Sequence, residues 1–264
     1  MKFSTAIIVS TYNWPKALEL SIKSVFKQTI LPNEIIIADD GSKSDTTQLI
    51  EELRNISPIE IKHVWHEDSG FRKTMIMNKG FAMCESDYII QIDGDIILHK
   101  KFVQDHIEIA ESGYFVSGKR AYINKKESLK LQVNPDKEIN FFALKDKMQV
   151  VRLPHFFNFR RLSNSKNPNK GIKGSNMAFW KKDIVNINGY DEELKMWGYE
   201  DKEIAARLIN SGVLKKRVRY RCLSYHLYHK IASKENLQFH QKVLDRTIDE
   251  KLVTCEKGLS QYMK

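Results

Sequence analysis

An apolar run that ends in two aspartates constrains this chain more than any other feature. Residues 88–98 read YIIQIDGDIIL, so a nearly continuous apolar stretch is broken by Asp93, Gly94 and Asp95. A run this apolar is typical of a strand covered on both faces, as in a parallel or mixed sheet. The sequence therefore predicts a buried strand with two carboxylates at its exit.

The two aspartates predict a metal site. Alternate side chains of a strand point the same way, so Asp93 and Asp95 are expected to face one side, with Cα atoms about 6.5–7 Å apart. Carboxylates at the end of a buried strand are costly unless a positive charge compensates them, and hard divalent cations bind through oxygen. Gly94 would let a ligand or another backbone segment come close. The alternative is an acidic Asp-Gly turn that binds nothing.

Strands and helices alternate before this run. Strands are expected at 6–10, 34–38 and 59–65, and helices near 15–26, 44–53 and 74–83. This order predicts an α/β fold, in which helices flank a mostly parallel sheet and ligands bind beyond the carboxyl ends of the strands. Neither GxGxxG after the first strand nor GxxxxGK[ST] occurs, which argues against a dinucleotide site and a P-loop. Three polar clusters lie at the expected strand ends, at 11–13, 39–42 and 93–95.

The second half of the chain is less regular. An irregular polar segment is expected at 121–170, a turn into a strand at 174–180 and a basic strand at 215–222. A helix begins near Glu200 and Asp201 and ends at Gly212, where glycine is a common helix stop. The tail from residue 232 is expected to be helical.

Charge and cysteine content narrow the setting. The net charge is +10, from 43 basic and 33 acidic residues, which suits nucleotide phosphates, nucleic acid or an anionic membrane surface. Three widely spaced cysteines predict neither a metal pair nor a disulfide framework, so a reducing cytoplasm fits. No apolar run is long enough for a membrane span, and the first residues read as a strand rather than a signal peptide. We expect a cytoplasmic protein.

Taken in order, the motifs resemble those of inverting glycosyltransferases of family 2, which have the GT-A fold. In the first half the matches are residues 10–13, residues 39–42, Gly70-Phe71-Arg72 with Asn78-Lys79-Gly80, and the DxD at 93–95. The second half is similar to the galactosyltransferase-type C-terminal region of chondroitin polymerase domains. There the matches are Gly174-Ser175-Asn176, residues 188–191, Trp197-Gly198-Tyr199-Glu200-Asp201 and Tyr225-His226.

The resemblance implies one GT-A domain in two halves. Residues 1–118 would form the nucleotide-sugar-binding half and residues 119–230 the acceptor-binding and catalytic half, followed by a helical tail at 231–264. The sequence departs from the family at Tyr199, where many relatives have a second glycine.

The resemblance also implies a donor and metal site. Asp39 or Asp40 would hold the nucleobase or ribose of a nucleoside-diphosphate sugar, usually a UDP-sugar. Asp95 would ligate Mn²⁺ or Mg²⁺, Asp93 would contact the ribose or the metal, and His226 would be a further metal ligand that favours Mn²⁺. His229 competes with His226 for this role. The other residues expected to contact the donor are Thr11, Tyr12, Asn13, Arg72, Asn78, Lys79 and Gly94, and Lys73 beside Arg72 could also reach the diphosphate.

On the acceptor side, the resemblance implies that Glu200 or Asp201 is the general base. We take Asp201 as the base that removes the acceptor proton, with Glu200 hydrogen-bonded to the acceptor. The alternative is that both acids only stabilise a helix start through its dipole. Sugar-binding contacts are expected from Asn176, Trp197, Gly198 and Tyr199, although core packing is an equal alternative for Tyr199.

These roles predict a metal-dependent inverting glycosyltransferase. It would move a sugar to a saccharide or lipid-linked saccharide in bacterial capsule or lipopolysaccharide synthesis. One alternative is a two-metal nuclease or phosphoryl-transfer enzyme built on Asp93, Asp95, Glu200 and Asp201. Another is a binding module without catalysis. No nucleic-acid-binding signature is present, so no nucleic acid partner is expected.

A basic run at 215–221, with Lys119 and Arg120, carries much of the positive charge. Such a run is typically a solvated face. We take as a hypothesis that it makes peripheral contact with anionic lipids at the inner face of the plasma membrane, where a lipid-linked acceptor would lie.

Overall fold

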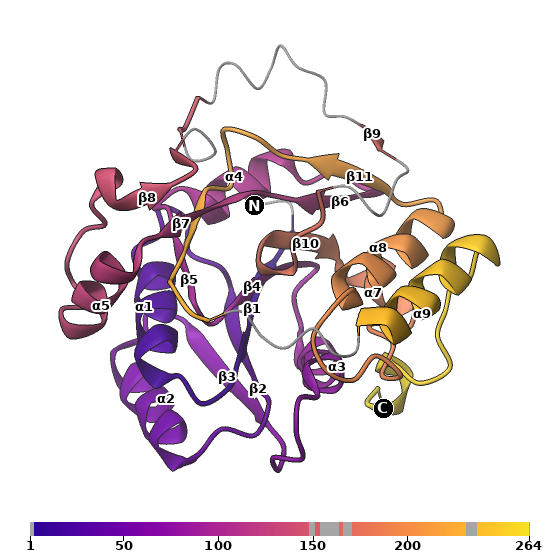
Figure 1. Ribbon diagram of the computed structural model, residues 1–264, viewed down its shortest axis with the longest axis horizontal. Coiled ribbons are helices and arrows are strands. Elements are labelled where there is room, and N and C mark those ends of the chain that lie inside the picture. The colour runs from indigo at the N-terminus through magenta and orange to yellow at the C-terminus, as the bar shows by residue number, and fades with distance from the viewer. Residues whose placement is uncertain (1–2, 148–150, 154–163, 166–170, 231–236, 264) are drawn as a thin grey trace.

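The computed structural model describes residues 3–147, 151–153, 164–165, 171–230 and 237–263. In the first part of the chain, strands and helices alternate as predicted, with ends that differ by a few residues (Figure 1). These elements are β1 (Thr5–Thr11), α1 (Pro15–Phe26), β2 (Glu34–Asp39), α2 (Ser44–Ile56), β3 (Glu60–Trp65), α3 (Lys73–Met83) and β4 (Tyr88–Asp93).

The chain after β4 forms shorter elements. They are β5 (Ile96–Leu98), α4 (Phe102–Ile109), β6 (Tyr114–Ser117), β7 (Arg120–Ile123), α5 (Lys125–Val133), η1 (Phe141–Ala143), β8 (Leu144–Lys145), β9 (Asn164–Ser165), η3 (Gly174–Asn176), β10 (Met177–Trp180), α7 (Lys181–Asn186), α8 (Glu200–Asn210), β11 (Leu214–Arg217), β12 (Ser224–His226), α9 (Leu237–Asp249) and η4 (Leu259–Gln261).

The expectation of an irregular segment over 121–170 is wrong for its first part, where β7 and α5 form. The apolar residues Leu129, Leu131 and Val133 of α5 are two positions apart, and of these only Leu131 is buried. The sequence therefore shows no helical period there. The last part of that segment lies mostly outside the described residues, as do residues 232–236 of the predicted helical tail.

The central sheet brings three strand ends together. Its order is β3-β2-β1-β4-β10-β6-β11-β9, and the first four strands are parallel. β10 is antiparallel to both of its neighbours. The register places Thr11 opposite Asp39 and Ser10 opposite Asp93. The polar clusters that follow β1, β2 and β4 therefore meet at one edge, as predicted.

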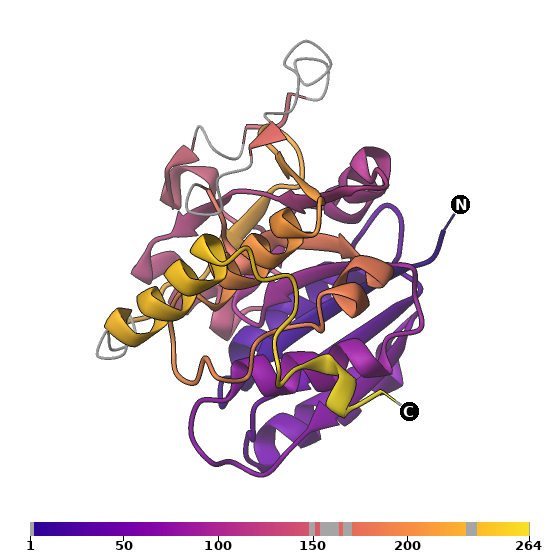
Figure 2. The ribbon, with the colours of Figure 1, turned by 90° about the vertical axis from the view of Figure 1, so that its right-hand side faces the viewer.

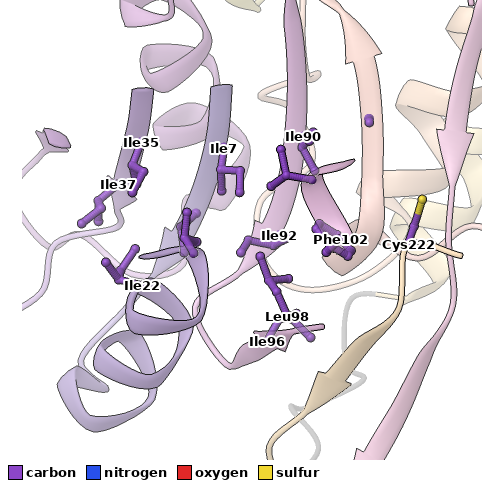
Figure 3. Close-up of a cluster of buried hydrophobic side chains, with 14 of the residues drawn as sticks. Ile7, Ile22, Ile35, Ile37, Ile90, Ile92, Ile96, Leu98, Phe102 and Cys222 are labelled. Carbon is purple, nitrogen blue, oxygen red and sulfur yellow. The ribbon is translucent and has the colours of Figure 1, made fainter. Parts of the chain in front are cut away.

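Apolar side chains fill both faces of this sheet. Ile7 and Val9 of β1 pack in one cluster with residues of α1, α2 and α4, whereas Ala6 and Ile8 pack in the other with residues of α3, α7 and α8. Figure 3 shows part of the first cluster, with Ile22 of α1 below the isoleucines of β2 and β1, and Ile90 and Ile92 of β4 further along the sheet. Helices thus cover both faces, as expected of an α/β fold.

A smaller sheet, of order β5-β12-β7-β8, begins where β4 ends. The turn Gly94-Asp95 leads from β4 into β5, which pairs antiparallel with β12. This register sets His226 opposite Ile96, the residue that follows Asp95. Strand pairing therefore brings a histidine from late in the chain to the DxD turn.

The C-terminal segment packs against both halves of the chain. α9 lies beside α8, as Figures 1 and 2 show from two directions. Leu259 belongs to the second core cluster, and its N–H donates to the carbonyl of Asn188 at 2.9 Å. Lys79 Nζ of α3 lies 5.7 Å from the ring centroid of Tyr262.

Candidate active site

One carboxylate and two imidazoles converge at the DxD turn. Asp95 Oδ2 lies 3.4 Å from Nε2 of His226 and 3.2 Å from Nε2 of His229. One possible ligand atom from each of the three residues can be chosen so that all lie within 4.8 Å of one another. The structure therefore brings both candidate histidines to Asp95, instead of selecting one.

Backbone contacts orient both rings. Nδ1 of His226 lies 2.6 Å from the carbonyl of Leu227, and Nδ1 of His229 lies 2.6 Å from the carbonyl of Lys230. Because a carbonyl only accepts, each Nδ1 carries a proton, so the Nε2 that faces Asp95 holds a lone pair in the neutral ring and a second proton in the charged ring. The pKa of His226 is lowered by burial, whereas hydrogen bonding to Asp95 raises the pKa of His229.

The donor atoms of this cluster fit a divalent cation. Oδ1 of Asp95 is buried and has no hydrogen-bond partner among the described residues. Two imidazole nitrogens and a carboxylate are ligands typical of transition-metal ions. The carbonyls behind the rings are the usual outer contacts of metal-binding histidines.

Asp93 takes different partners from Asp95. β4 ends at Asp93, so the strand alternation that predicted a shared face does not extend to Asp95. Oδ1 of Asp93 lies 2.7 Å from Lys73 Nζ and accepts from Ser10 Oγ at 3.0 Å. Burial would raise the pKa of Asp93, but the ion pair with Lys73 outweighs it and lowers the pKa to about 2.

Gly94 is required by the backbone of β1. Its N–H donates to the carbonyl of Ser10 at 2.7 Å, and a Cβ at this position would lie 3.0 Å from the same oxygen. The sequence predicted that either a ligand or another backbone segment would come close to Gly94. The structure shows a backbone segment, that of β1.

The acids at the end of β2 are each held by a histidine. Asp39 Oδ1 accepts from the N–H of Ser42 at 2.8 Å, and Oδ2 lies 3.0 Å from His63 Nε2. Asp40 Oδ1 lies 2.7 Å from His66 Nε2. Neither histidine was predicted as a site residue, although the β2–β3 pairing could have placed them near these acids.

The same network joins β1 and α3 to the acids. Asp40 Oδ2 accepts from the N–H of Arg72 at 2.8 Å. Asn13, whose φ of 45° is left-handed, donates from its N–H to Ser42 Oγ at 2.8 Å and accepts from the N–H of Lys43 at 2.9 Å. Thr11 is buried opposite Asp39, so the clusters at 11–13 and 39–42 are adjacent.

The remaining donor candidates differ in exposure. Tyr12 is half exposed, and its hydroxyl donates to Asp68 at 2.9 Å. The Arg72 guanidinium donates to the carbonyl of Glu67, and Lys79 Nζ lies 3.5 Å from His66 Nδ1. These side chains lie around the edge formed by β1, β2 and α3.

Asn78 and Asn176 are fully buried and hydrogen-bonded within the chain. Asn78 Nδ2 donates to the carbonyl of Tyr190 and to Glu192 Oε1, both at 2.9 Å, and its Oδ1 accepts from the N–H of Tyr190 at 2.7 Å. Asn176 Nδ2 donates to the carbonyls of Lys119 and Cys222. The expected ligand contacts do not match this burial, which makes both residues structural ties between loops.

Glu200, which is buried, and Asp201, which is partly buried, begin α8 as an acidic pair. Asp201 Oδ2 accepts from the N–H of Gly174 at 2.9 Å, and Oδ1 accepts from the Tyr190 hydroxyl at 3.2 Å. Glu200 Oε2 accepts from the N–H of Gly198 at 2.9 Å. Both side chains are therefore held in place by groups outside the helix interior.

The pair is hard to ionise. Burial is the main cause that raises the pKa of Glu200, to about 7, and the neighbouring Asp201 raises it further. Burial also raises the pKa of Asp201, and the charge of Asp93 adds to this effect. Lys73 opposes the rise in both cases. Perturbed acids of this kind are common at functional sites.

The loop before α8 contains a residue with a left-handed backbone and is contacted by α9. Tyr199, which precedes the helix, has a φ of 60°, a left-handed conformation that favours the glycine found in many relatives. His240 of α9 contacts the carbonyls of Gly198 and, at 2.6 Å, Lys195. Trp197 is 40% exposed between these points. The C-terminal helix thus supports the expected acceptor wall.

Arg120 was predicted only as part of the basic surface near residues 215–221, but it lies beside the candidate site. Its guanidinium donates to Ser175 Oγ and lies 5.4 Å from the ring centroid of Tyr122. Its charge acts on Asp93 and on His226, lowering the pKa of each. Arg120 therefore lies on the side of the site where Asp95, His226 and His229 converge.

The basic run at 215–221 is not a uniformly solvated face. Lys215 and Lys216 of β11 are buried. Lys216 pairs with Glu111, and Arg221 pairs with Glu108 at 2.7 Å. The expectation of an exposed run is wrong at these two lysines, because β11 lies inside the central sheet. No helix among the described residues is both long and apolar enough to cross a membrane.

Comparisons with known proteins agree with this architecture. The model of the family described as "Glycosyl transferase family 2" matches residues 6–186, and one described as "N-terminal domain of galactosyltransferase" matches residues 154–230. The chain is 30% identical to chondroitin synthase of Escherichia coli over 237 residues, which cover 84% of this chain and 34% of that protein. It is 28% identical to hyaluronan synthase of Pasteurella multocida, covering 81% of this chain and 23% of that protein. The chain thus spans about a third or less of these relatives.

Solved structures show the same fold. TarS of S. aureus superposes with a TM-score of 0.66 and 16% identity, covering 98% of this chain and 41% of TarS. The mannosyltransferase PcManGT of Pyrobaculum calidifontis superposes with a TM-score of 0.59 and 15% identity, covering 94% of this chain and 63% of that one. These likenesses establish the GT-A fold. The first family model covers well over half of the sequence, and the chain therefore belongs to glycosyl transferase family 2.

Proposed function

We propose that this glycosyltransferase moves a sugar from a nucleoside-diphosphate sugar, UDP-linked, to a saccharide or lipid-linked saccharide with inversion at the anomeric carbon. One observation carries the proposal. Lys73 is ion-paired with Asp93, two residues before the cluster of Asp95 with His226 and His229, and its charge also interacts with Glu200 and Asp201 at the start of α8. A donor and an acceptor bound at such a site would meet beside Lys73.

The donor would bind over the ends of β1 and β2. Asp39 and Asp40 are fixed there by backbone and histidine contacts, and the half-exposed Tyr12 offers a ring face to a nucleobase. Thr11 and Asn13 shape the same edge. A solved structure of TarS contains UDP, which supports a UDP-sugar as the first donor class to test.

Asp95, His226 and His229 would hold a divalent cation, for which imidazole ligands favour Mn²⁺ over Mg²⁺. The ion would neutralise charge on the diphosphate as the sugar–phosphate bond breaks. The PcManGT structure contains GDP-mannose and Mn²⁺, which supports this pairing of donor and metal. Because Asp93 is paired with Lys73, we assign it the ribose contact and not a place among the metal ligands.

Asp201 would remove the proton from the acceptor hydroxyl as that oxygen attacks the anomeric carbon. Gly174 and Tyr190 each hold one of its carboxylate oxygens, which fixes its direction while lone pairs remain free to accept a proton. Glu200 would hydrogen-bond the acceptor, and Trp197 would pack against a sugar ring. One in-line displacement accounts for inversion.

The acceptor is proposed to belong to bacterial surface polysaccharide synthesis, because relatives are named chondroitin synthase and hyaluronan synthase. A lipid-linked acceptor would bring the protein to the inner face of the plasma membrane. Sedimentation with anionic liposomes at low salt tests this point, and the absence of salt-sensitive binding would refute it.

A transfer assay tests the proposed reaction. UDP-, GDP- and CDP-sugars are incubated with the protein, a saccharide acceptor panel and either Mn²⁺ or EDTA, and release of nucleoside diphosphate is measured. We expect release of nucleoside diphosphate that requires both the acceptor and the metal. NMR of the product should show an inverted anomer. A retained anomer in the product would refute the inverting mechanism. The family assignment already favours a glycosyltransferase over the nuclease alternative.

A further inference from the structure

His240 lies on the buried face of α9, where the helix pattern favours an apolar residue. The other buried residues of this face follow at helical spacing and are Val243, Leu244 and Thr247. Because a buried polar group without a hydrogen bond costs free energy, the imidazole needs partners inside the protein. Residue 240 also lies after residue 230, where the second family match ends, so the family resemblance assigns it no role.

Both ring nitrogens of His240 contact backbone carbonyls of the loop before α8. Nε2 lies 2.6 Å from the carbonyl oxygen of Lys195, and Nδ1 contacts that of Gly198. A carbonyl only accepts, so each hydrogen bond needs a proton on the ring, of which a neutral imidazole supplies one and an imidazolium two. The ring therefore donates at least one hydrogen bond in either charge state, and it spans the segment 195–198 from end to end.

The backbone of this segment depends on contacts from outside. Met196 has a φ of 73°, and Tyr199, directly after the segment, has a φ of 60°. A left-handed backbone at a residue other than glycine costs free energy and persists only where surrounding contacts fix it. The hydrogen bonds of His240 supply such contacts from α9.

The same segment carries groups that we propose for the acceptor side. Trp197 is 40% exposed. The peptide group before Gly198 donates its N–H to Glu200 Oε2 at 2.9 Å, and the peptide group after it carries the carbonyl that contacts His240. One glycine thus links the histidine of α9 to an acid of α8.

The helix that carries His240 is fixed to α8 further along. The hydroxyl of Thr247 lies 3.2 Å from Glu203 Oε1, and Asn210 Nδ2 donates to the carbonyl of Thr247 at 3.0 Å. Figures 1 and 2 both show the two helices side by side. His240 lies seven residues before Thr247 on the same face, so these contacts also determine where the imidazole meets the loop.

We propose that His240 is a positioning residue whose ring holds the segment 195–198, and with it Trp197 and Glu200, in the place that an acceptor sugar requires. The C-terminal helix then contributes to acceptor binding through this segment. The acceptor role rests on the proposed function, whereas the hold on the segment does not.

Three substitutions separate the two contacts. H240F keeps an aromatic ring and removes both nitrogens, whereas H240N keeps a donor near the position of Nδ1 and H240Q keeps one near Nε2. The matched control is T247V, which removes a polar group that contacts α8 from the same buried face of α9. Circular dichroism shows whether each variant is folded.

Hydrogen exchange measured by mass spectrometry tests the hold on the segment without any substrate. We expect the amides of residues 196–201 to exchange about tenfold faster in H240F than in wild type. Of H240N and H240Q, at least one should exchange faster than wild type, because each lacks one contact, and at least one should exchange more slowly than H240F.

Wild-type exchange in H240F would overturn the inference, as would an equal increase in T247V. Exchange as fast as in H240F in both H240N and H240Q would assign the effect to packing and also overturn it. Should H240F not fold, wild-type exchange in both H240N and H240Q would count against the inference in the same way.

Where transfer is measurable, H240F should raise the KM for the acceptor about tenfold and change the KM for the donor by less than about twofold. An equal rise in the donor KM, or a lower kcat with both KM values unchanged, would refute the acceptor role. Absence of transfer in wild type would instead refute the proposed function and leave the exchange result standing.

Discussion

The N–H of Gly174 donates a hydrogen bond to Asp201 Oδ2 at 2.9 Å, and a Cβ atom built on Gly174 would overlap both carboxylate oxygens of Asp201. The glycine and the acid are 27 residues apart in the chain. Only a residue without a side chain therefore allows the carboxylate its observed place.

We predict that Gly174→Ala displaces the Asp201 carboxylate. A displacement of about 1 Å at a reacting group can cost about a hundredfold in rate, so kcat should fall by about that factor while binding of UDP with Mn²⁺ is kept. Steady-state kinetics and isothermal titration calorimetry measure the two quantities.

Gly113→Ala is the control for this variant. Gly113 has a φ of 81° but open space around its Cβ position, so alanine there tests backbone strain without a clash. An unchanged kcat in Gly174→Ala would show that the carboxylate position does not matter.

Asp201→Asn should abolish transfer and leave UDP affinity nearly intact, because the amide keeps the shape but cannot take a proton. We expect a loss in kcat of about 10²–10⁴-fold. Glu200→Gln is the matched comparison, with a smaller loss in kcat. If Asp201→Asn turns over normally and Glu200→Gln does not, the roles of the two acids are reversed.

His226→Ala and His229→Ala should each weaken Mn²⁺ binding, because both Nε2 atoms face Asp95. We expect a fall in affinity of about 10–100-fold for each, measured by calorimetry in the presence of UDP. His99→Asn serves as a control, since the ring of His99 accepts from the N–H of Lys101 elsewhere. Normal Mn²⁺ affinity in His229→Ala would leave His226 as the histidine ligand.

Protein stability should depend on pH through Glu200. Its pKa is raised from 4.5 to about 7 in the folded state, so the folded protein binds more protons than the unfolded chain between these values. The free energy of unfolding should therefore fall as pH rises from about 4.5 to 7, by a few kcal/mol at most.

Glu200→Gln removes this titration, so the melting temperature of wild type relative to the variant should drop across that interval. Thermal unfolding at half-unit pH steps measures the difference. A difference that is constant with pH would contradict the raised pKa.

The sequence predicted the sheet and the edge at which its three polar clusters meet, because apolar runs and the acids that follow them are local features. Asp39, Asp93 and Asp95 lie where parallel strands must end. The alternation that placed Asp93 and Asp95 on one face failed, because the strand stops at Asp93 and a turn follows.

Contacts between distant segments were not predictable in the same way. From the sequence, Lys73 is either a diphosphate contact or a solvated loop charge, and its ion pair with Asp93 depends on β4 arriving beside α3. Asn78 and Asn176 match family motifs, yet their amides are used to hold other loops. Lys215 reads as part of a basic face, but its strand lies inside the sheet.

The central claim is that nucleoside diphosphate and a divalent cation bind together at the edge formed by β1, β2 and β4. Isothermal titration calorimetry of UDP into the wild-type protein, with Mn²⁺ and with EDTA, tests it most directly, with GDP, CDP and a short oligonucleotide as comparisons. The account predicts that UDP binds with Mn²⁺ and that its affinity falls in EDTA. Binding of the oligonucleotide alone, with no nucleoside diphosphate bound under either condition, would contradict it.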